Sequence, residues 1–366
     1  VGSGTPRIDF LGNTKGALKL EPTRTNSINY SEKVLLWSIS GTVVRQDNVS
    51  ISPDGKQTAS TIAVGNDTSF NRIRQNFSVS ANSTCTASLF IKKVQTETNY
   101  LGVGVVFSGG TTDVAYVSFD SVNGIARNMD SRITAILNVV DYGTYWRLES
   151  TATDSGSNTQ LEMSVYPTLS TDGINVAPGA GSVRTIWGMQ LESNSSYATS
   201  YIPTSGQSGG VTRVAETSSQ TVPDGVIGQT EGTVFAQINI SSIESVGGFS
   251  AFRIYDGTTS NAISFIIYPT GRIQSTAFNS GSLVANINDN DYGLTSGVHK
   301  IAFAYKLNDY ILYVDGLLVG TDTSATVPTT NKFDLSYTNV GSHNYNQTKL
   351  YNTRLSNAEL ASLTTI

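Results

Sequence analysis

Cysteine, histidine and charge are all scarce in this sequence of 366 residues. Its 1 cysteine, Cys85, excludes an internal disulfide framework, and it is expected to be a buried packing residue and not a nucleophile. Its 2 histidines, His299 and His343, leave few bases for a Ser-His-Asp triad. No apolar run reaches the roughly 18 residues that a membrane span requires. The sequence therefore predicts neither a disulfide scaffold nor a protein that inserts into a membrane.

Positive charge is also sparse. The formal net charge is -5, the isoelectric point is about 5.1, and no run of Lys or Arg exceeds Lys92-Lys93. A nucleic-acid partner is not expected, because such partners need clustered basic residues. The opening "VGSGTPRIDF" lacks the charged and apolar regions of a signal peptide, which predicts a trimmed start or export by another route.

Glycine, tyrosine and small polar residues are abundant instead. The chain has 34 Gly and 17 Tyr, 38% of its residues are hydrophobic, and only 14% are charged. β-branched and aromatic residues suit pleated surfaces, while Gly and Asn supply turns, so an all-β protein is predicted. The length is that of about two domains, since a domain typically has roughly 100 to 200 residues.

Short alternating runs separated by turn signals predict strands in both halves, as in sandwiches and barrels. In the first half they cover residues 57–64, 70–79, 84–93, 100–107, 113–119, 145–152, 160–166 and 184–192. In the second half they cover 231–240, 249–256, 261–268, 271–278, 297–305, 309–315, 317–321 and 332–340. The predicted division is a jelly roll with an N-terminal lead segment over 1–205, a linker over 206–230 and a second sandwich over 231–366.

Three local patterns sharpen this prediction. In "TIWGMQLE", strict alternation places Trp187, Met189 and Leu191 on one face, which is expected to face the core. Asp315-Gly316, between "YILYV" and "LLVG", predicts a two-residue type I′ hairpin. "RLSNAELASL" predicts one short C-terminal helix whose capping box consists of Ser356 and Glu359.

Several segments together resemble tail-fibre and receptor-binding proteins of phages and prophages. They are "GTPRIDF", "KLEPTRTNSINYSE", "FNRIRQNFSV", "CTASLFIKK", "WRLESTAT" and "WGMQLE…SYATSYIPTSG…VTRVAE", over roughly residues 5 to 216. The repeating unit of those proteins is similar to a carbohydrate-binding-module jelly roll. The resemblance implies that 187–205 is a closing strand followed by an ordered Tyr-Ile-Pro tether.

The second half resembles concanavalin A-like or laminin-G-like sandwiches, through "EGTVFAQINI", "LYVDGLLV" and "YNTRLSNAEL". Such folds mostly bind glycans, but some are lyases or hydrolases, so the fold alone does not decide. The resemblance of the first half to tail-fibre proteins implies a viral protein or adhesin, located extracellularly or in the virion tail. It also implies a homo-oligomer, usually a trimer.

No catalytic set is recognised. "GQSGG" at 206–210 fits the Gly-x-Ser-x-Gly pattern, but Ser208 lies in a Gly-rich tether and not between a strand and a helix. His299 is expected to be a packed or edge histidine. Glu149, Glu162 and Glu192 lie on predicted strands, where outward-facing solubilising roles are expected, although glycoside hydrolysis would need two such carboxyls close together. The chain is therefore predicted not to be an enzyme, with the question left open.

A structural Ca²⁺ is a hypothesis for "NINDNDYG", where Asp289 and Asp291 would supply hard oxygen ligands. The simpler interpretation is a solvated Asx-rich turn. Sugar binding needs exposed aromatic rings beside polar groups. Trp37, Trp146 and Trp187 are expected in the core, so the predicted glycan-binding residues are those in polar loops: Tyr292, His343, Asn344 and Tyr345.

These features predict a non-catalytic glycan-binding protein that recognises cell-surface polysaccharide, a component of a phage tail fibre or a related adhesin. One alternative is a polysaccharide-degrading enzyme, a lyase or a glycoside hydrolase, with its site on the second sandwich. The other is a structural spacer. The sequence does not name the glycan.

Overall fold

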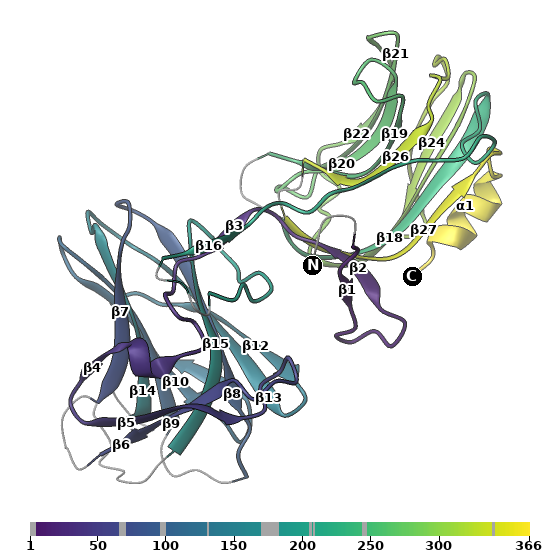
Figure 1. The fold of residues 1–366 in the computed structure, drawn as a ribbon. Coiled ribbons are helices and arrows are strands. Elements are labelled where there is room, and N and C mark those ends of the chain that lie inside the picture. Colours follow the sequence, from purple (N-terminus) through teal and green to yellow (C-terminus); the bar gives the residue numbers. More distant parts are fainter. Residues whose placement is uncertain are drawn as a thin grey trace. The chain divides into compact units, whose positions relative to one another are not determined.

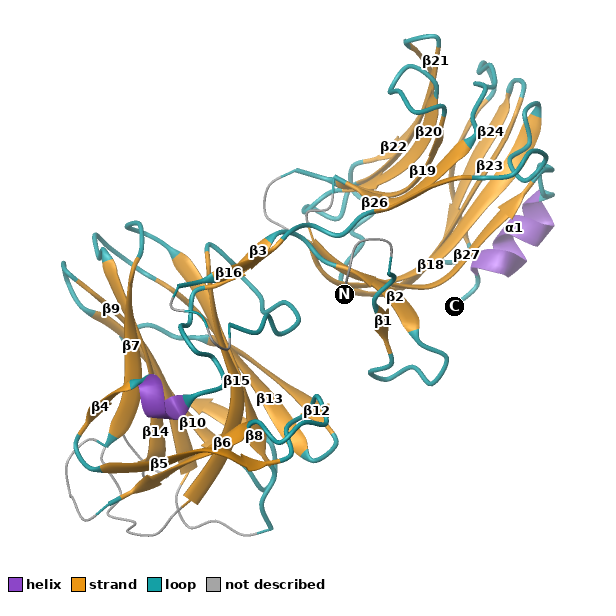
Figure 2. Ribbon diagram, viewed as in Figure 1, coloured by secondary structure: helices purple, strands orange, loops and turns teal. Residues whose placement is uncertain are grey.

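The computed structural model describes residues 5–65, 71–95, 100–129, 132–169, 183–204, 207, 209–243, 247–338 and 341–366. Almost all regular elements of this part are strands, with one 3₁₀ helix and one α-helix (Figures 1 and 2). The all-β prediction is therefore confirmed. The chain forms two compact units: a continuous unit, Arg24–Arg213, and a split unit that combines Val1–Thr23 with Val214–Ile366.

The continuous unit is a sandwich of two antiparallel sheets, each with six strands within the described ranges. The first sheet has the order β11 (Ile125–Asn128), β10 (Asp113–Asp120), β9 (Tyr100–Ser108), β14 (Gln160–Leu169), β7 (Arg72–Ser78) and β4 (Ser38–Ser40). The second has the order β12 (Ile136–Tyr142), β13 (Tyr145–Thr153), β8 (Thr84–Lys92), β15 (Val183–Ser193), β6 (Ala59–Val64) and β5 (Val43–Ser50). Alternate side chains from the two sheets form one apolar core that includes Cys85, which is fully buried as predicted.

The chain enters and leaves the continuous unit on paired strands. β3 (Arg24–Asn26) runs antiparallel to β16 (Val211–Arg213), so the two ends of the unit meet. The segment after β15 is held by buried Glu192, whose carboxylate accepts from the backbone N–H of Thr199 at 2.9 Å and from its hydroxyl at 2.5 Å. The junction is thus ordered because a buried carboxylate satisfies the backbone of the tether.

A β-bulge corrects the predicted face of Trp187. The register of β15 against β8 shifts between Trp187 and Gln190, and Gly188 adopts a φ of 62°, a left-handed conformation that glycine adopts readily. Met189 therefore joins the core between the sheets, while Trp187 packs beside Phe90 and Tyr201 in a separate cluster. Trp187 is buried as expected, but it does not share the face of Met189 and Leu191.

The split unit is a second sandwich, again of antiparallel strands. Its larger sheet, seven strands within the described residues, has the order β1 (Ile8–Asp9), β2 (Ala17–Leu20), β27 (Gly341–Tyr351), β18 (Glu231–Ile243), β23 (Gly297–Lys306), β24 (Asp309–Val314) and β25 (Leu317–Asp322). The second sheet, which we call the groove sheet, has the order β17 (Ser218–Thr221), β26 (Lys332–Tyr337), β19 (Phe249–Tyr255), β20 (Ala262–Ile267), β21 (Ile273–Asn279) and β22 (Ser282–Asp289). Phe252, Phe265 and Phe303 are fully buried between the two sheets.

This division differs from the predicted one at the N-terminus. The lead segment does not belong to the first sandwich: β2 pairs with β27, with Leu18 opposite Tyr345 and Leu20 opposite His343. Arg7 forms ion pairs with Glu21 and Glu216, and the pair with Glu216 holds the lead segment against the segment that follows β16. Pairing between residues more than 300 positions apart leaves no local sequence pattern, so the prediction assigned the lead segment to its nearest neighbours.

Both local predictions in the split unit are confirmed. Asp315 and Gly316 have φ values of 52° and 83° between paired Val314 and Leu317, as a type I′ turn requires. Helix α1 (Asn357–Thr364) begins with a complete capping box of Ser356 and Glu359. In the part of the chain that the structure describes, no helix combines the length and apolar character needed to cross a bilayer.

Candidate functional site

Two of the predicted glycan-binding residues lie inside the split unit. β27, a strand that the sequence analysis did not predict, contains His343 and Tyr345, which are 0% and 4% exposed. The His343 ring stacks on Phe249 with centroids 3.8 Å apart, and the Tyr345 hydroxyl donates to the Ala251 carbonyl at 2.6 Å. The expectation that these rings lie in an exposed loop is wrong, because β27 is paired with β2 on one side and β18 on the other.

Asn344 and Tyr292 are also engaged in structure. The Asn344 side-chain amide donates to Asp9 at 3.1 Å, and only 9% of the residue is exposed. The Tyr292 hydroxyl donates to the Val314 carbonyl at 3.2 Å, and its ring packs against the core. Burial raises the pKa of Tyr292 to about 12. All four predicted residues have packing or hydrogen-bonding roles, and their binding of glycan stays a prediction without a structural argument.

The proposed calcium ligands Asp289 and Asp291 lie at the end of β22 and just after it. Asp289 accepts a hydrogen bond from the Asp291 backbone N–H at 3.0 Å, which is the geometry of an Asx turn. Across the described ranges, no group of three or more His, Cys, Asp or Glu side chains is placed to hold a metal ion. The calcium hypothesis stays a prediction.

A calcium titration tests it directly. If Asp289 and Asp291 bind Ca²⁺, titrating the chelator-treated protein is expected to give a saturable heat and a higher melting temperature, since a ligand stabilises the state that binds it. The double variant Asp289→Asn/Asp291→Asn should lose both signals. Absence of heat and of any thermal shift in the unmodified protein would contradict the hypothesis.

The candidate catalytic groups are occupied by structural partners. Glu162 forms ion pairs with Arg72 and Arg74 at 3.2 and 2.7 Å, and Glu149 lies 3.3 Å from Arg147. Glu162 and Glu192 are 9% and 0% exposed, so the predicted solubilising role is wrong for both. Ser208 lies outside the described residues.

His299 lies near the start of β23 and its side chain is 12% exposed, which fits the prediction of a packed or edge histidine. Its Nδ1 lies 2.7 Å from Asp315 and its Nε2 lies 2.9 Å from the Thr295 carbonyl. Burial alone would lower the pKa of His299, but the hydrogen bond to Asp315 and the charge of that residue raise it overall. This pair joins the ends of β23 and β24 around the type I′ turn and is explained by structure alone.

A groove on the outer face of the groove sheet has the character of a ligand site. Its main hollow has a volume of about 560 Å³ and lies over β19, β20, β21 and the end of β26. The lining combines rings and aliphatic groups with hydroxyls: Tyr268, Phe278, Tyr337 and Ile266 beside Ser250, Ser260, Ser264 and Thr276. Pockets for small molecules commonly have this mixture of apolar surface and a few convergent polar groups.

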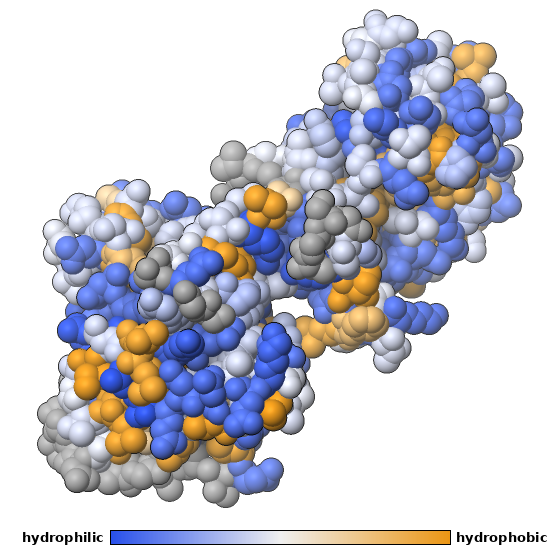
Figure 3. Space-filling view, viewed as in Figure 1, coloured by the Kyte–Doolittle hydropathy of each residue, from blue (hydrophilic) through white to orange (hydrophobic). Residues whose placement is uncertain are grey.

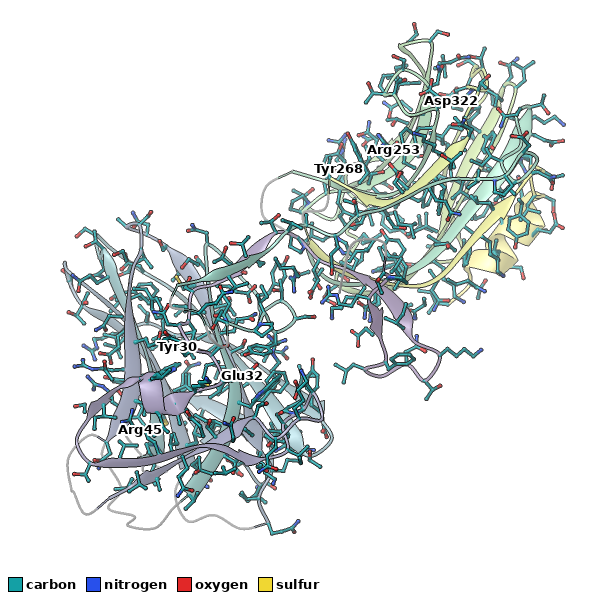
Figure 4. All side chains as sticks on the ribbon, viewed as in Figure 1. Tyr30, Glu32, Arg45, Arg253, Tyr268 and Asp322 are labelled. Carbon is teal, nitrogen blue, oxygen red and sulfur yellow. The ribbon has the colours of Figure 1, made fainter. Side chains whose placement is uncertain are left out.

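Arg253 on β19, which Figure 4 labels, is a charged residue in the lining of the groove. Its guanidinium donates to Asp334 of the neighbouring strand β26 at 2.5 Å, and the two side chains are only 7% and 6% exposed. The same guanidinium lies 3.8 Å from the ring centroid of Tyr255 and 3.6 Å from that of Tyr337. The positive charge is thus offset by Asp334, and the guanidinium serves as a rigid support for two aromatic rings.

The sheet is locally distorted to direct these side chains outwards. A register shift between Ser250 and Phe252 lets both Ser250 and Arg253 line the hollow, although their odd spacing would place them on opposite faces of a regular strand. Ser336 and Thr338, on either side of Tyr337, have φ values of 54° and 56°. Left-handed φ in a β-branched residue costs of order 1–3 kcal/mol, and such strain clusters at binding and catalytic sites.

Tyr337 is the most accessible ring of this group, with 40% of the residue exposed. Across the hollow, Tyr268 packs against Gly248, where a Cβ atom would approach its ring to 2.8 Å. The Tyr268 hydroxyl donates to Gln274 at 2.8 Å, and Arg272 stacks on the ring at 4.3 Å. Both rings are therefore held in place before any ligand arrives, which lowers the entropy cost of binding.

A second, smaller hollow of about 250 Å³ adjoins the first. It lies over β17, β19 and β26 and is lined by Thr217, Ser218, Ser219 and Tyr255. Arg253 and Tyr337 line both hollows, so the two form one groove with Tyr337 between them. Together they present aromatic faces, hydroxyls and one neutralised ion pair, an arrangement suited to binding and orienting a polar ligand.

Exposed apolar side chains form a different surface on the continuous unit. They gather where β5 and the 3₁₀ helix η1 (Val34–Leu36) lie (Figure 3). Leu35, Leu36 and Val44 are 50%, 55% and 54% exposed. These groups are aliphatic, so they lack the flat rings on which sugars stack, and the groove remains the better candidate for a glycan.

Sequence analysis did not identify Arg253, Asp334 or Tyr337. One signal was available, because Arg253 interrupts the apolar strand "FSAFRIY". A charged residue inside a buried strand usually has an oppositely charged or hydrogen-bonding partner. Its partner Asp334 lies 81 positions further on, so the pair becomes visible only through the register of β19 with β26.

No family model and no curated protein matches this chain. Solved structures match with low scores. The leech intramolecular trans-sialidase in complex with 2,7-anhydro-Neu5Ac aligns with 38% of this chain and 24% of its own, at 16% identity and a TM-score of 0.33. The CBM40 of the Ruminococcus gnavus IT-sialidase aligns with 37% of this chain and 84% of its own, with the same identity and score.

A third structure comes from work on botulinum neurotoxin type C, whose cell entry depends on interaction with two ganglioside molecules. It aligns with 43% of this chain and 40% of its own, at 13% identity and a TM-score of 0.34. The alignments thus span about a quarter of the leech enzyme and less than half of the toxin structure. At these scores the likeness carries no argument about function, which has to come from the groove itself.

Proposed function

We propose that this protein binds a glycan through the groove of the split unit, without catalysing a reaction on it. The observation that supports this most is Tyr337, an exposed ring fixed on Arg253 above a hydroxyl-lined hollow. Pyranose rings present apolar C–H faces that stack on aromatic rings, while their hydroxyls pair with polar groups at the edge. The groove offers both kinds of contact within one hollow of about 560 Å³.

In biological terms, we propose a receptor-binding component of a phage tail fibre or a related adhesin, exposed on the virion or outside the cell. The motifs that resemble tail-fibre proteins support this role. The partner would be a cell-surface polysaccharide, and binding would be avid, because copies in a homo-oligomer raise the effective concentration of individually weak sites.

Replacing Tyr337 with alanine is expected to weaken polysaccharide binding at least about fivefold, since loss of a central aromatic contact removes more than about 1 kcal/mol. The measurement is co-elution of protein with bacterial and algal polysaccharides in size-exclusion chromatography with light scattering, followed by titration calorimetry on polymers that bind. Polymer that gains mass indicates binding, whereas polymer that shrinks would reveal an active site and contradict the non-catalytic proposal.

Tyr197→Ala is the matched control. Tyr197 lies in the continuous unit and also has an arginine, Arg24, against its ring, at 5.3 Å. The Tyr197→Ala variant should bind polysaccharide with the same affinity as the unmodified protein. Equal binding by the Tyr337 and Tyr197 variants would remove the groove from consideration as the glycan site.

A further inference from the structure

The groove is longer than its main hollow. The hollow of about 560 Å³ lies over β21, β20 and β19, and that of about 250 Å³ lies over β26 and the edge strand β17. These five strands are consecutive neighbours in the groove sheet. Because neighbouring strands lie about 4.8 Å apart, four spacings correspond to about 19 Å, more than one sugar ring occupies.

Tyr337 lies at the boundary of the two hollows and lines both. Its ring is packed on one side by the Arg253 guanidinium at 3.6 Å, while 40% of the residue remains exposed. The two hollows therefore adjoin at Arg253 and Tyr337, where a sugar can stack on the exposed part of the Tyr337 ring.

The two ends of the groove offer similar chemistry. Ser260, Ser264 and Thr276 line the larger hollow, and Ser218 and Ser219 line the smaller one. Hydroxyls at both ends suit a ligand that carries hydroxyls along its whole length. A closed pocket that recognises one chain end would instead be expected to concentrate its polar groups around a single position.

We propose that the groove binds an internal stretch of a glycan chain, with successive sugars in the two hollows and one stacked on Tyr337. This inference rests on the proposed function and narrows its ligand to an extended chain. When one sugar of a chain is bound, the next sugar binds at a high effective concentration, so affinity rises with chain length until both hollows are filled and then levels off.

Neutral oligosaccharide ladders test the proposal, because Asp334 offsets the charge of Arg253. The probes are gluco-, manno- and galacto-oligosaccharides from disaccharides to octasaccharides, titrated calorimetrically against the full chain. In the ladder that binds, affinity is expected to rise at least about tenfold, equivalent to 1.4 kcal/mol, between the shortest and the longest members.

A blocking variant assigns this rise to the smaller hollow. Ser219 lies on the exposed edge strand β17, so Ser219→Trp should fill that hollow without touching the larger one. We expect it to abolish the gain in affinity with chain length. Gln220→Trp, which directs the same ring to the other face of β17, is the control and should keep the full gain.

The outcomes separate this inference from the proposed function. Affinity that is independent of length, or a gain that survives in Ser219→Trp, overturns the extended-chain inference while glycan binding stands. If no ladder and no parent polysaccharide binds, both the inference and the proposed function fail.

Discussion

Replacing Asp334 with alanine is expected to lower the free energy of unfolding of the split unit by about 3–5 kcal/mol. The carboxylate is the ion-pair partner of Arg253, and both side chains are almost completely buried. Removing one member of such a pair leaves the other charge without compensation in a medium of low polarity. The Arg253 Nε already has no hydrogen-bond partner among the described residues, so the substitution leaves the guanidinium to its contacts with the rings of Tyr255 and Tyr337.

The distribution of tryptophan makes this measurement specific. Trp37, Trp146 and Trp187 are the only tryptophans of the sequence, and all three lie in the continuous unit. Tryptophan fluorescence therefore follows unfolding of the continuous unit, while differential scanning calorimetry follows both units. We expect Asp334→Ala to shift a calorimetric transition and to leave the fluorescence transition in place.

Two further variants test whether the loss of stability in Asp334→Ala comes from the unpaired charge of Arg253. Asp309→Ala breaks the ion pair between Asp309 and Arg354, and the Asp309 side chain is 47% exposed. Because the pair is exposed to solvent, this substitution should lower the free energy of unfolding by less than about 1 kcal/mol. Replacing both members of the central pair, in Arg253→Met/Asp334→Leu, should restore much of the lost stability, since no unpaired charge remains. If Asp334→Ala costs no more than Asp309→Ala, the ion pair is not the support of the groove that we infer.

The strands that sequence analysis predicted share one property, an alternation of apolar and polar residues between turn signals. β8, with Cys85, Ala87 and Leu89 directed into the core, is an example. The hairpin at Asp315-Gly316 and the helix cap at Ser356 were predictable for a related reason: the chemistry that defines them lies within four residues.

β22 and β27 were missed, and both site predictions depended on them. Their sequences, "SLVANIND" and "GSHNYNQTKLY", are rich in Asn, Gln and other polar residues that are typical of loops. They form strands because of their neighbours: β27 lies between β2 and β18, and β22 pairs with β21. Tertiary context overrides strand propensity in this way, and it converted a predicted exposed loop into a buried strand.

The groove could not be predicted for a different reason. Strict alternation places Ser250 and Arg253 on opposite faces of a strand, and only the bulge in β19 brings them to one hollow. The left-handed residues beside Tyr337 are a serine and a threonine, not the glycines that would have signalled an unusual backbone. Departures from regular geometry thus create the candidate site, and they leave little trace in residue patterns.

The stability of the split unit is expected to depend on pH through His343. This ring is fully buried against Phe249, and burial lowers its pKa to about 3. In the unfolded chain the pKa of histidine is about 6.5. Between these two values the unfolded state binds more protons than the folded state, so stability rises with pH. The contribution is fully present above about pH 6.5 and is lost as the pH falls towards 3.

His343→Phe is the variant that isolates this effect. Phenylalanine keeps an aromatic ring against Phe249 and cannot be protonated, and neither ring nitrogen of His343 has a hydrogen-bond partner among the described residues. Each pH unit below 6.5 is worth about 1.4 kcal/mol, so at pH 4.5 the unmodified protein should have lost about 2–3 kcal/mol relative to the variant. Urea unfolding followed by circular dichroism at pH 7.5 and pH 4.5 measures the difference.

Carboxylates that titrate in the same pH range are present in both proteins, so their contributions to the pH dependence largely cancel in the comparison. Tryptophan fluorescence again reports the continuous unit, whose pH dependence should be the same with and without the substitution. Parallel stability curves for the two proteins between pH 7.5 and 4.5 would show that His343 is protonated as readily in the folded state as in the unfolded chain. That result would contradict its burial in β27 and reopen the original prediction that His343 lies on an accessible surface.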